Sequence, residues 1–327
     1  MTSETIGIIG SGAFGSALAI SIATSNQNVI QWCREAKTAS SIMYDRQNKA
    51  LLPNIAFPES VTATNNLADL AKCDYIFMVT PAQFTRNICQ NIRELNFLNN
   101  NITLIACSKG IEASSLMLQS EIIAEILPRN PIAVLSGPTL ALEVANCLPS
   151  YANLATLDHN HLHNIKNIFK NTNITIHPLN DIIGTQIGGI LKNIIAIGCG
   201  IAHSLNFGEN FHAALINQGI KEAAYLTKCK GGNPQTMIEL CGIGDMILTC
   251  SSTKSRNFSF GSRIGQGEGI QNILSKAPSI VEGYKSVKPL IDLTKRMQIH
   301  LPLCEVIYRI LYESQDPKTL LDANLAS

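Results

Sequence analysis

The sequence predicts an α/β Rossmann-type domain with a parallel sheet, followed by an all-α helical domain. In the first half, short β-branched runs alternate with helical segments, which is typical of a parallel sheet covered by helices. A glycine-rich turn follows the first of these runs and opens a helix. After about Ile182 the strand patterns fade and helical periodicity remains. Because 327 residues exceed the usual size of one hydrophobic core, we expect two domains, residues 1–182 and 183–327.

Nine segments of the predicted first domain carry strand or helix patterns. The predicted strands are 5–10, 28–32, 74–80, 101–107, 131–137 and 152–157, and the predicted helices are 13–24, 114–127 and 140–145. In the second domain we expect helices at 182–203, 211–228, 234–240, 271–274 and 303–312. Pro289 suits the first turn of a further helix, where its missing N–H costs nothing.

The composition excludes several classes of protein. Hydrophobic residues make up 46% and charged residues 15%, which describes an ordinary globular protein. A net charge of +1 provides no basic surface for nucleic acid or anionic membrane. The longest apolar runs look shorter than the roughly 20 residues of a transmembrane helix. The first residues also lack the basic segment of a signal peptide. We expect a cytoplasmic protein that binds no nucleic acid and does not insert stably into membranes.

Two residue types could indicate a covalent framework or a metal site. The ten cysteines are scattered without a CxxC pair, which fits free thiols in a reducing compartment. His159, His161 and His163 alternate, and residues two apart do not share a helix face, so metal binding would require a strand or loop. Asp158 ahead of them instead favours a capped surface helix, and we expect no metal.

The turn with Gly10, Gly12 and Gly15 has the spacing of a dinucleotide-binding loop. Gly10 permits the tight turn, Gly12 lets a pyrophosphate approach the backbone, and Gly15 lets helix and strand pack closely. The alternative is a plain glycine turn of an α/β fold. The strand before the turn and the helix after it favour the dinucleotide, whose phosphates the helix N-terminus would bind.

The end of the second predicted strand bears on the choice of cofactor. Gln31 stands where NAD-binding enzymes usually have an acidic residue for the ribose hydroxyls, and Arg34 lies just beyond. Without a carboxylate a 2′-phosphate is tolerated, and Arg34 can pair with it. This predicts NADP(H), or a relaxed choice between NADP(H) and NAD(H). Alternatively, Arg34 is a solvated residue at the start of the next helix.

Lys192 is the single charge in the apolar segment 184–202. A lysine whose pKa is lowered by desolvation or a nearby like charge can protonate the alkoxide left by hydride reduction of a ketone. The residues that share its helix face are small, namely Thr185, Gly188, Gly189, Ala196 and Cys199. We expect a hollow there, with room for substrate and cofactor. The alternative is a lysine that reaches water along apolar surface.

Three further residues are candidates for the same site. Lys109 directly follows a predicted strand, where ligands of open parallel sheets bind, and could supply the like charge. Thr139 follows the next strand and could hold an anion or the cofactor amide, or simply cap a helix. Asp245 lies between glycines and an apolar run, an awkward place for an unpaired carboxylate. We expect it to pair with a catalytic lysine or bind a substrate hydroxyl; a structural ion pair is the alternative.

A hydroxyl, a guanidinium and an amide are adjacent at Ser255, Arg256 and Asn257. This combination suits a phosphate, since arginine can bind phosphate oxygens with two parallel hydrogen bonds. Alternatively, these three residues form a polar turn with an arginine at the protein surface.

Six motifs, in order along almost the whole chain, resemble those of the bacterial NAD(P)-dependent glycerol-3-phosphate dehydrogenases. They are GSGAFGSALA, SKGIE, SGPTLALEVANCLPS, IGGILKNIIAIGCG, GIGDMILTCSSTKSRNFSFG and VEGYKS. The resemblance implies reversible hydride transfer between NAD(P)H and dihydroxyacetone phosphate, giving sn-glycerol 3-phosphate for phospholipid synthesis. It also implies a homodimer and a helical C-terminal domain like that of 6-phosphogluconate dehydrogenase.

The resemblance also assigns roles to individual residues. Lys192 would be the catalytic acid and base, with Lys109 and Asp245 beside it. The cofactor would contact Gly10, Gly12, Ala13, Phe14, Gly15, Arg34, Lys109, Ala141, Arg256, Ile280 and Glu282. The substrate would contact Lys109, Gly137, Thr139, Lys192, Asp245, Ser255, Arg256 and Asn257.

One departure and two alternatives accompany this interpretation. Gln218 stands where the family usually has arginine, so we assign it no catalytic role. A related dehydrogenase acting on a hydroxyacid would have the same two-domain plan, but Arg256 and the second lysine favour a phosphate. A non-catalytic NAD(P)-binding sensor would have no need of Lys109, Lys192 and Asp245.

Overall fold

The structure is a computed structural model that describes residues 4–276 and 280–323. It divides into two compact units, one made of Met1–Ser108 and Gln119–Ile182, the other of Lys109–Leu118 and Ile183–Ser327. The segment 109–118 differs from the predicted division, which assigned it to the first domain. It belongs to the second unit because Ile111 and Leu118 lie in that unit's apolar core.

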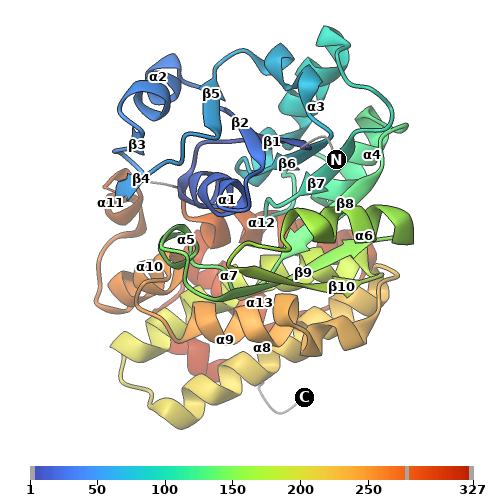
Figure 1. The fold of residues 1–327 in the computed structure, drawn as a ribbon. Coiled ribbons are helices and arrows are strands. Elements are labelled where there is room, and N and C mark those ends of the chain that lie inside the picture. Colours follow the sequence, from blue (N-terminus) through green and yellow to red (C-terminus); the bar gives the residue numbers. More distant parts are fainter. Residues whose placement is uncertain (1–3, 277–279, 324–327) are drawn as a thin grey trace. The chain divides into compact units, whose positions relative to one another are not determined.

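An eight-stranded sheet forms the centre of the first unit, in the order β10-β9-β8-β7-β6-β1-β2-β5 (Figure 1). Its strands are β1 (Thr5–Ile9), β2 (Asn28–Trp32), β5 (Val61–Thr64), β6 (Tyr75–Met78), β7 (Thr103–Ala106), β8 (Ile132–Ser136), β9 (Ser150–Thr156) and β10 (Ile174–Leu179). Neighbouring strands are parallel except for β8 and β9. The strands β6 and β7 are buried along their whole length, as expected of strands with helices on both faces.

Helices and a small hairpin complete the first unit. The helices are α1 (Ala13–Ala23), α2 (Ala36–Tyr44), α3 (Thr85–Leu95), α4 (Gln119–Ile126), α5 (Ala141–Ala145) and α6 (His159–Ile168). Short 3-10 turns are η1 (Leu67–Lys72) and η2 (Ala82–Phe84), and β3 (Gln47–Asn48) pairs antiparallel with β4 (Leu52–Ala56). All six predicted strands are present. The sequence did not predict α2, α3, β5, β10 or the hairpin, and α4 begins later than predicted because the chain before it joins the second unit.

The alternating histidines lie on a helix, as the sequence predicted. The Asp158 carboxylate accepts a hydrogen bond from the His161 amide at 3.4 Å, at the start of α6. The His161 ring contacts the hydroxyl of Thr103 at 3.0 Å. Within the described residues there is no group of three or more side chains that could hold a metal ion.

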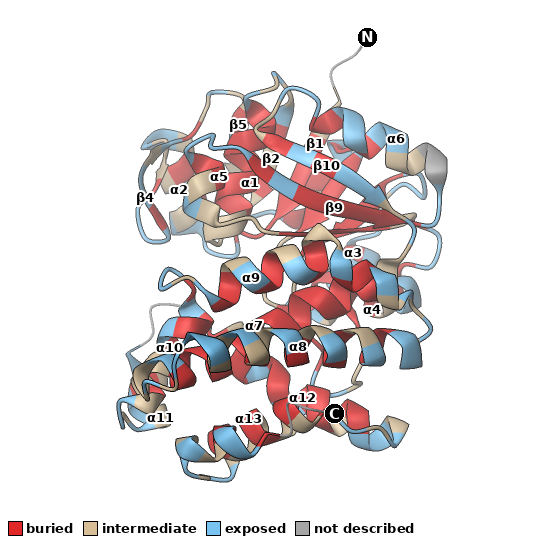
Figure 2. Cartoon of the chain, turned by 90° about the horizontal axis from the view of Figure 1, so that it is seen from below, coloured by how far each residue is buried: buried red, intermediate tan, exposed pale blue. Residues whose placement is uncertain are grey.

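The second unit is helical and surrounds one long apolar helix. Its helices are α7 (Ile182–Ser204), α8 (Glu209–Cys229), α9 (Asp245–Cys250), α10 (Arg256–Gly265), α11 (Ile270–Ser275), α12 (Glu282–Met297) and α13 (Pro302–Tyr312). Shorter turns are η3 (Pro234–Ile238), η4 (Leu240–Gly244) and η5 (Pro317–Asp322). Figure 2 shows α7 as buried almost throughout, with α8 and α9 beside it. The predicted helical character of this half is therefore confirmed.

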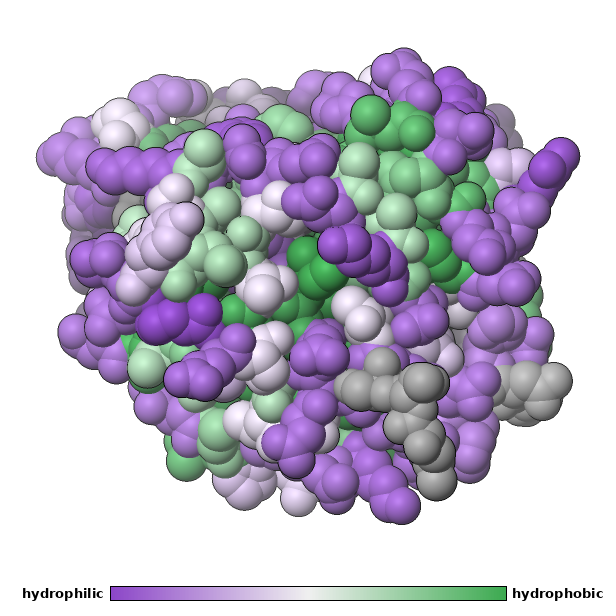
Figure 3. Space-filling model, turned by 45° about the horizontal axis from the view of Figure 1, so that its top comes forward, coloured by the Kyte–Doolittle hydropathy of each residue, from purple (hydrophilic) through white to green (hydrophobic). Residues whose placement is uncertain are grey.

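The length of α7 corrects one inference from the sequence. With 23 residues it is long and apolar enough to cross a membrane, whereas the apolar runs had looked too short. However, 89% of its most apolar stretch is buried inside the protein, which is the position of a core helix. Hydrophilic side chains cover most of the face shown in Figure 3, with smaller apolar patches among them.

Pro289 does not begin a helix; it lies inside α12. Its missing N–H leaves the carbonyl of Lys285 without the usual helical partner. The helix continues because its buried face runs on through Val287, Pro289 and Leu290. Burial of this face outweighs the local loss of one hydrogen bond.

Candidate active site

The glycine turn between β1 and α1 has the geometry of a phosphate-binding loop. Gly10 has a φ of +125°, and a Cβ there would lie 2.6 Å from the carbonyl oxygen of Val79. A Cβ on Gly15 would lie 2.3 Å from the carbonyl oxygen of Gly10. Both positions therefore require glycine for packing inside the first unit.

Gly12 is different, because a Cβ there would have no described atom within 4 Å. The glycine keeps open space in front of the backbone, as a bound pyrophosphate requires. No described side chain caps the N-terminus of α1, so its amides remain available to an anion. Ala13 and Phe14 form the first turn of this helix. These residues fit a dinucleotide.

Gln31 and Arg34 lie in very different surroundings. The Gln31 side chain is fully buried and donates to the Gly10 carbonyl oxygen at 3.0 Å, so it does not stand where a ribose-binding acid would. This corrects the comparison made from the sequence. The strand ends one residue later, and Arg34 is exposed just before α2, pairing with Glu35 at 3.3 Å. Both interpretations of Arg34 are compatible with this exposure.

Asp245 forms ion pairs with both candidate lysines of the second unit. Its Oδ1 lies 2.5 Å from Nζ of Lys192, and its Oδ2 lies 2.7 Å from Nζ of Lys109. Asp245 is 1% exposed, on the first turn of α9. Lys192 comes from the middle of α7, and Lys109 from the short segment that follows β7. The predicted pairing of Asp245 with a lysine is therefore present, and it includes both lysines.

The electrostatics of this cluster lower the pKa values of two groups. Burial lowers the pKa of Lys192 to about 8; Asp245 opposes this effect, while the charge of Lys109 adds to it. Burial alone would raise the pKa of Asp245, but the two lysines outweigh it and hold that pKa below its usual value. The cluster therefore combines a carboxylate whose ionised form is stabilised with an amine whose pKa is lowered to about 8.

Thr249 completes the cluster, and the sequence analysis missed it. Its hydroxyl accepts from Lys192 at 3.0 Å and donates to Asp245 at 3.3 Å. It lies one helical turn after Asp245 on α9, so the i, i+4 spacing places both side chains on one face. That spacing was a signal that could have identified it.

The small residues beside Lys192 do not all leave a hollow. A Cβ on Gly188 would lie 2.4 Å from the carbonyl oxygen of Cys241, so this glycine lets the backbone of η4 pack against α7. The interpretation of Gly188 as room for substrate is therefore wrong. The side chain of Lys192 retains 11% exposure. It is neither in an open hollow nor stretched along apolar surface toward water.

The strand-to-helix turn after β8 has a tightly packed backbone. A Cβ on Gly137 would lie 2.8 Å from Cα of Ala152 in β9. The Thr139 hydroxyl donates to the Gly137 carbonyl at 3.2 Å, and the N-cap of α5 is Leu140, so Thr139 is not the helix cap. Ala141 is the first residue of α5.

The polar triplet that precedes and opens α10 is partly engaged inside the second unit. The Ser255 hydroxyl caps the helix by accepting from the amide of Phe258 at 3.3 Å. The Asn257 amide donates to Asn193 at 2.9 Å and accepts from Gly283 at 3.0 Å. Arg256, between them, is the first residue of α10 and is exposed.

The neighbouring cofactor candidates lie at the start of α12. Ile280 is 38% exposed, and its carbonyl accepts from Arg256 at 3.3 Å. Glu282 is the first residue of α12, and burial raises its pKa to about 7, against the lowering effect of Arg256. Arg256, Ile280 and Glu282 therefore form one group within the second unit.

Gln218 belongs to a buried hydrogen-bond network at the start of α13. It is buried and donates to Glu222 at 3.3 Å. Glu222 in turn accepts from the amides of Leu303 at 2.6 Å and Cys304 at 3.1 Å, at the first turn of α13. The pair thus caps a helix whose own N-cap residue is Leu301.

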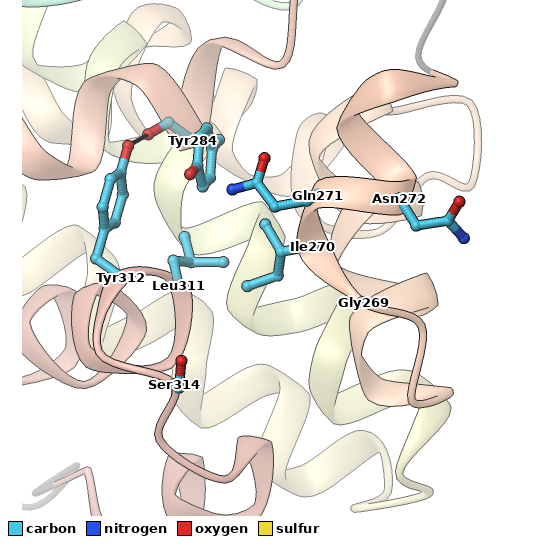
Figure 4. Close-up of a pocket in the computed structure, with 8 residues that line it drawn as sticks. All are labelled: Gly269, Ile270, Gln271, Asn272, Tyr284, Leu311, Tyr312 and Ser314. Atoms are coloured by element: carbon cyan, nitrogen blue, oxygen red, sulfur yellow. Dashed lines mark hydrogen bonds between the residues drawn. The ribbon is translucent and has the colours of Figure 1, made fainter.

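None of the predicted site residues lines a hollow of about 430 Å³ in the second unit. Neutral residues line it, and in Figure 4 the Tyr312 hydroxyl reaches the backbone of Tyr284, to whose carbonyl it donates at 2.8 Å. The lining residues are Gly269, Ile270, Gln271, Asn272, Tyr284, Leu311, Tyr312 and Ser314. None of these offers a charge for a phosphate or a carboxylate.

Two family models cover nearly the whole chain. The N-terminal model of NAD-dependent glycerol-3-phosphate dehydrogenase matches residues 5–162, and the C-terminal model matches residues 181–322. The chain belongs to this family. It is an NAD(P)-dependent oxidoreductase of the glycerol-3-phosphate dehydrogenase type. The resemblance inferred from the six motifs is confirmed.

Individual relatives agree with the family models. The glycerol-3-phosphate dehydrogenase [NAD(P)+] of Ehrlichia chaffeensis is 40% identical over 94% of this chain and 95% of the relative. That of Caulobacter vibrioides is 39% identical over 95% of this chain and 93% of the relative. The crystal structure of glycerol-3-phosphate dehydrogenase from Coxiella burnetii covers 99% of both chains, with 30% identity and a TM-score of 0.94.

A hydroxyacid dehydrogenase shares only the fold. D-mandelate dehydrogenase matches with 15% identity and a TM-score of 0.64 over 97% of this chain and 99% of that protein. The related hydroxyacid enzyme considered from the sequence therefore has the same architecture, but no comparable sequence similarity.

Proposed function

We propose that the Lys192–Asp245–Lys109 cluster is the catalytic centre for reversible reduction of dihydroxyacetone phosphate to sn-glycerol 3-phosphate. The observation that supports this most directly is the buried ammonium of Lys192, which lies 2.5 Å from Asp245, a carboxylate that also pairs with Lys109 at 2.7 Å. Burial lowers the pKa of Lys192 to about 8. Bound NAD(P)H supplies the hydride that adds to C2 of the ketone. Residues of this chain then donate the proton that the resulting alkoxide needs.

Lys192 supplies that proton. Its ammonium has three N–H donors, of which Asp245 and Thr249 accept two in the structure. We propose that the third donates to the substrate oxygen. As C2 accepts hydride, the oxygen takes a proton from Lys192, which becomes neutral. In the reverse reaction neutral Lys192 removes the proton from the hydroxyl. A pKa near the working pH suits both directions.

Asp245, Thr249 and Lys109 position and tune this acid. Asp245 stays ionised and fixes the ammonium in place, with Thr249 bridging the two groups. Lys109 lowers the pKa of Lys192 and provides a second cation for the substrate. Arg256, at the start of α10, is the candidate for binding phosphate oxygens. Ser255 and Asn257 hold that helix start, and we propose Gly137 and Thr139 as further contacts of the substrate.

An absorbance assay tests the proposed substrate. Oxidation of NADPH and NADH is followed with dihydroxyacetone phosphate and, in parallel, with 2-keto acids. We expect turnover with the phosphate and none with the acids. Turnover confined to 2-keto acids would favour the hydroxyacid alternative, and absence of turnover with every substrate would favour the sensor.

Exchanging Arg34 for alanine tests selection of the cofactor. Arg34 is exposed next to Glu35, where a 2′-phosphate could replace the carboxylate as its partner. We expect Arg34→Ala to weaken NADPH binding about tenfold, the effect of losing one charge-assisted hydrogen bond, and NADH binding much less. Dissociation constants from fluorescence titration measure both, with Arg93→Ala, on α3, as the control. Equal losses for the two cofactors would remove the 2′-phosphate role.

The cellular setting completes the proposal. The product is the backbone of phospholipids, and we propose that the enzyme works in the cytoplasm as a homodimer. Light scattering after size-exclusion chromatography tests the dimer; a mass near 35.4 kDa would show a monomer instead.

A further inference from the structure

Two buried amides hold the backbone of the phosphate-binding loop from beneath. Nε2 of Gln31, on β2, donates to the Gly10 carbonyl oxygen at 3.0 Å. Nδ2 of Asn48, on β3, donates to the Ser11 carbonyl oxygen at 2.8 Å. Gln31 is 0% exposed and Asn48 is 2% exposed. Two consecutive carbonyls of the loop are thus tied to the interior of the first unit.

Ser16 joins the two amides into one network. Its hydroxyl oxygen lies 2.9 Å from Nδ2 of Asn48 and 3.5 Å from Nε2 of Gln31. Ser16 is fully buried on the second turn of α1. The Asn48 oxygen accepts from the amide of Leu51 at 3.4 Å, so the NH2 group of Asn48 has to face the loop. Both hydrogens of that NH2 group are therefore used on the loop and on α1.

The direction of these hydrogen bonds determines where the loop amides point. In a trans peptide the C=O and the following N–H point in opposite directions. When the carbonyls of Gly10 and Ser11 are tied inward, the N–H groups of Ser11 and Gly12 face outward. We infer that they face the open space at Gly12, where the pyrophosphate of a dinucleotide would bind.

We propose that Asn48 and Gln31 are positioning residues for the cofactor: they pre-organise the phosphate-binding loop by holding its carbonyls away from the pyrophosphate. Without them the two peptides can rotate, and a carbonyl oxygen turned outward repels the phosphate. Pre-organisation of this kind increases affinity because the loop loses less freedom on binding. Asn48 contributes more than Gln31, since its hydrogen bonds to the loop and to Ser16, at 2.8 and 2.9 Å, are shorter than those of Gln31, at 3.0 and 3.5 Å.

Apolar variants of matched size test the proposal. Asn48→Leu and Gln31→Met keep the volume of the side chain but remove the donor. The control is Asn130→Leu, because Asn130 is also buried and donates to two backbone carbonyls, those of Asn99 at 2.9 Å and Ile102 at 3.0 Å. Asn130 lies in the first unit but makes no hydrogen bond to the loop. Urea unfolding shows how much stability each variant loses.

The decisive measurements are the dissociation constant of NADPH and the separate kinetic constants. We expect Asn48→Leu to raise the dissociation constant and the KM of NADPH about tenfold. We expect Gln31→Met to raise both by a smaller factor. The kcat and the KM of dihydroxyacetone phosphate at saturating NADPH should stay within about twofold of the native values, since uniform cofactor binding is what was lost. Asn130→Leu should lose stability while keeping its affinity for NADPH.

Two results would overturn the proposal. One is an unchanged dissociation constant in Asn48→Leu and Gln31→Met; the other is an equal increase in Asn130→Leu, which would show a general effect of destabilisation. If Asn48→Leu does not fold, Gln31→Met decides by the same comparison with the control.

Discussion

Lys192 carries the chemistry at the scale of single residues, so its replacement gives the clearest prediction. Lys192→Met keeps much of the buried apolar stem but removes the proton donor. We expect kcat to fall by about 10³-fold, within the range of general acid–base catalysis. The dissociation constant of NADPH should change less than twofold. Lys221→Met, at an exposed position on α8, is the control. Retained activity would identify a different acid.

The pKa of Lys192 predicts opposite pH profiles for the two directions. Ketone reduction needs the charged amine, so kcat should be level below about pH 8 and fall above it. Oxidation of the alcohol needs the neutral amine, so its kcat should rise up to about pH 8 and then level off. In Lys109→Met the midpoint should move to higher pH, because the like charge that lowers the pKa is gone. Identical profiles in both directions would contradict this role.

Sequence reasoning found the three charged residues of the Lys192–Asp245–Lys109 cluster and missed two neutral residues, Thr249 and Asn48. Lys192 and Asp245 are identified because each charge stands in an apolar or glycine-rich context, and Lys109 because it directly follows a predicted strand. Thr249 carries no charge, and a threonine in a helix is ordinary, so only its i, i+4 spacing from Asp245 could have identified it. Asn48 could not be found, because its partners Ser11 and Ser16 lie 37 and 32 residues away in sequence. Chain folding alone brings these residues together.

At the scale of elements, a close contact between α7 and η4 lies directly before the start of α9. Gly188 has no room for a side chain because the backbone of Cys241 lies against it. Four residues after Cys241, Asp245 opens α9 and pairs with Lys192 on the same helix as Gly188. The glycine therefore allows the close approach that brings carboxylate and lysine together.

Gly188→Ala should accordingly reduce both stability and activity. The added methyl group forces η4 away, and we expect the free energy of unfolding in urea to fall by about 2 kcal/mol. Displacement of Asp245 should lower kcat by roughly tenfold, since small misplacements at a catalytic centre are expensive. Gly198→Ala on the same helix is the control, because its methyl group meets side-chain atoms of Ile307 and Leu320 and no backbone. If both variants retain full activity, η4 does not position Asp245.

Elements with strong patterns were predicted well, and short or polar ones were not. The six predicted strands are apolar runs, whereas β5 (VTAT) is short and half polar and β10 (ITIHPL) contains a proline. Pro289 misled the prediction of a helix start, because local preference favours proline in the first turn. Tertiary burial of α12 overrode that preference.

At the scale of the whole molecule, the exposure of the ten cysteines predicts how many of them react with thiol reagents in the folded protein. Cys147 and Cys229 are exposed, and the other eight cysteines are buried. We expect two thiols to react rapidly with a disulfide reagent under native conditions and all ten in guanidinium chloride. Absorbance of the released thiolate gives the count. More than two rapid thiols would mean that the core opens readily.

The overall architecture followed from the sequence because two different periodicities divide the chain. Strand and helix patterns alternate in the first half, and helical patterns alone fill the second. The exception is the segment 109–118, which no periodicity marked as part of the helical unit. Its membership depends on long-range packing of Ile111 and Leu118, which local patterns do not record.

The inclusion of segment 109–118 in the second unit affects how the protein folds during synthesis. The ribosome releases residues 109–118 long before the helices that will cover them. Until α7 and its neighbours emerge, Ile111 and Leu118 have none of the partners that bury them in the finished protein. Lys109 likewise awaits Asp245, which lies 136 residues further along the chain. The nucleotide-binding sheet can form early in translation, but the catalytic ion pairs are completed only when most of the chain has been synthesised.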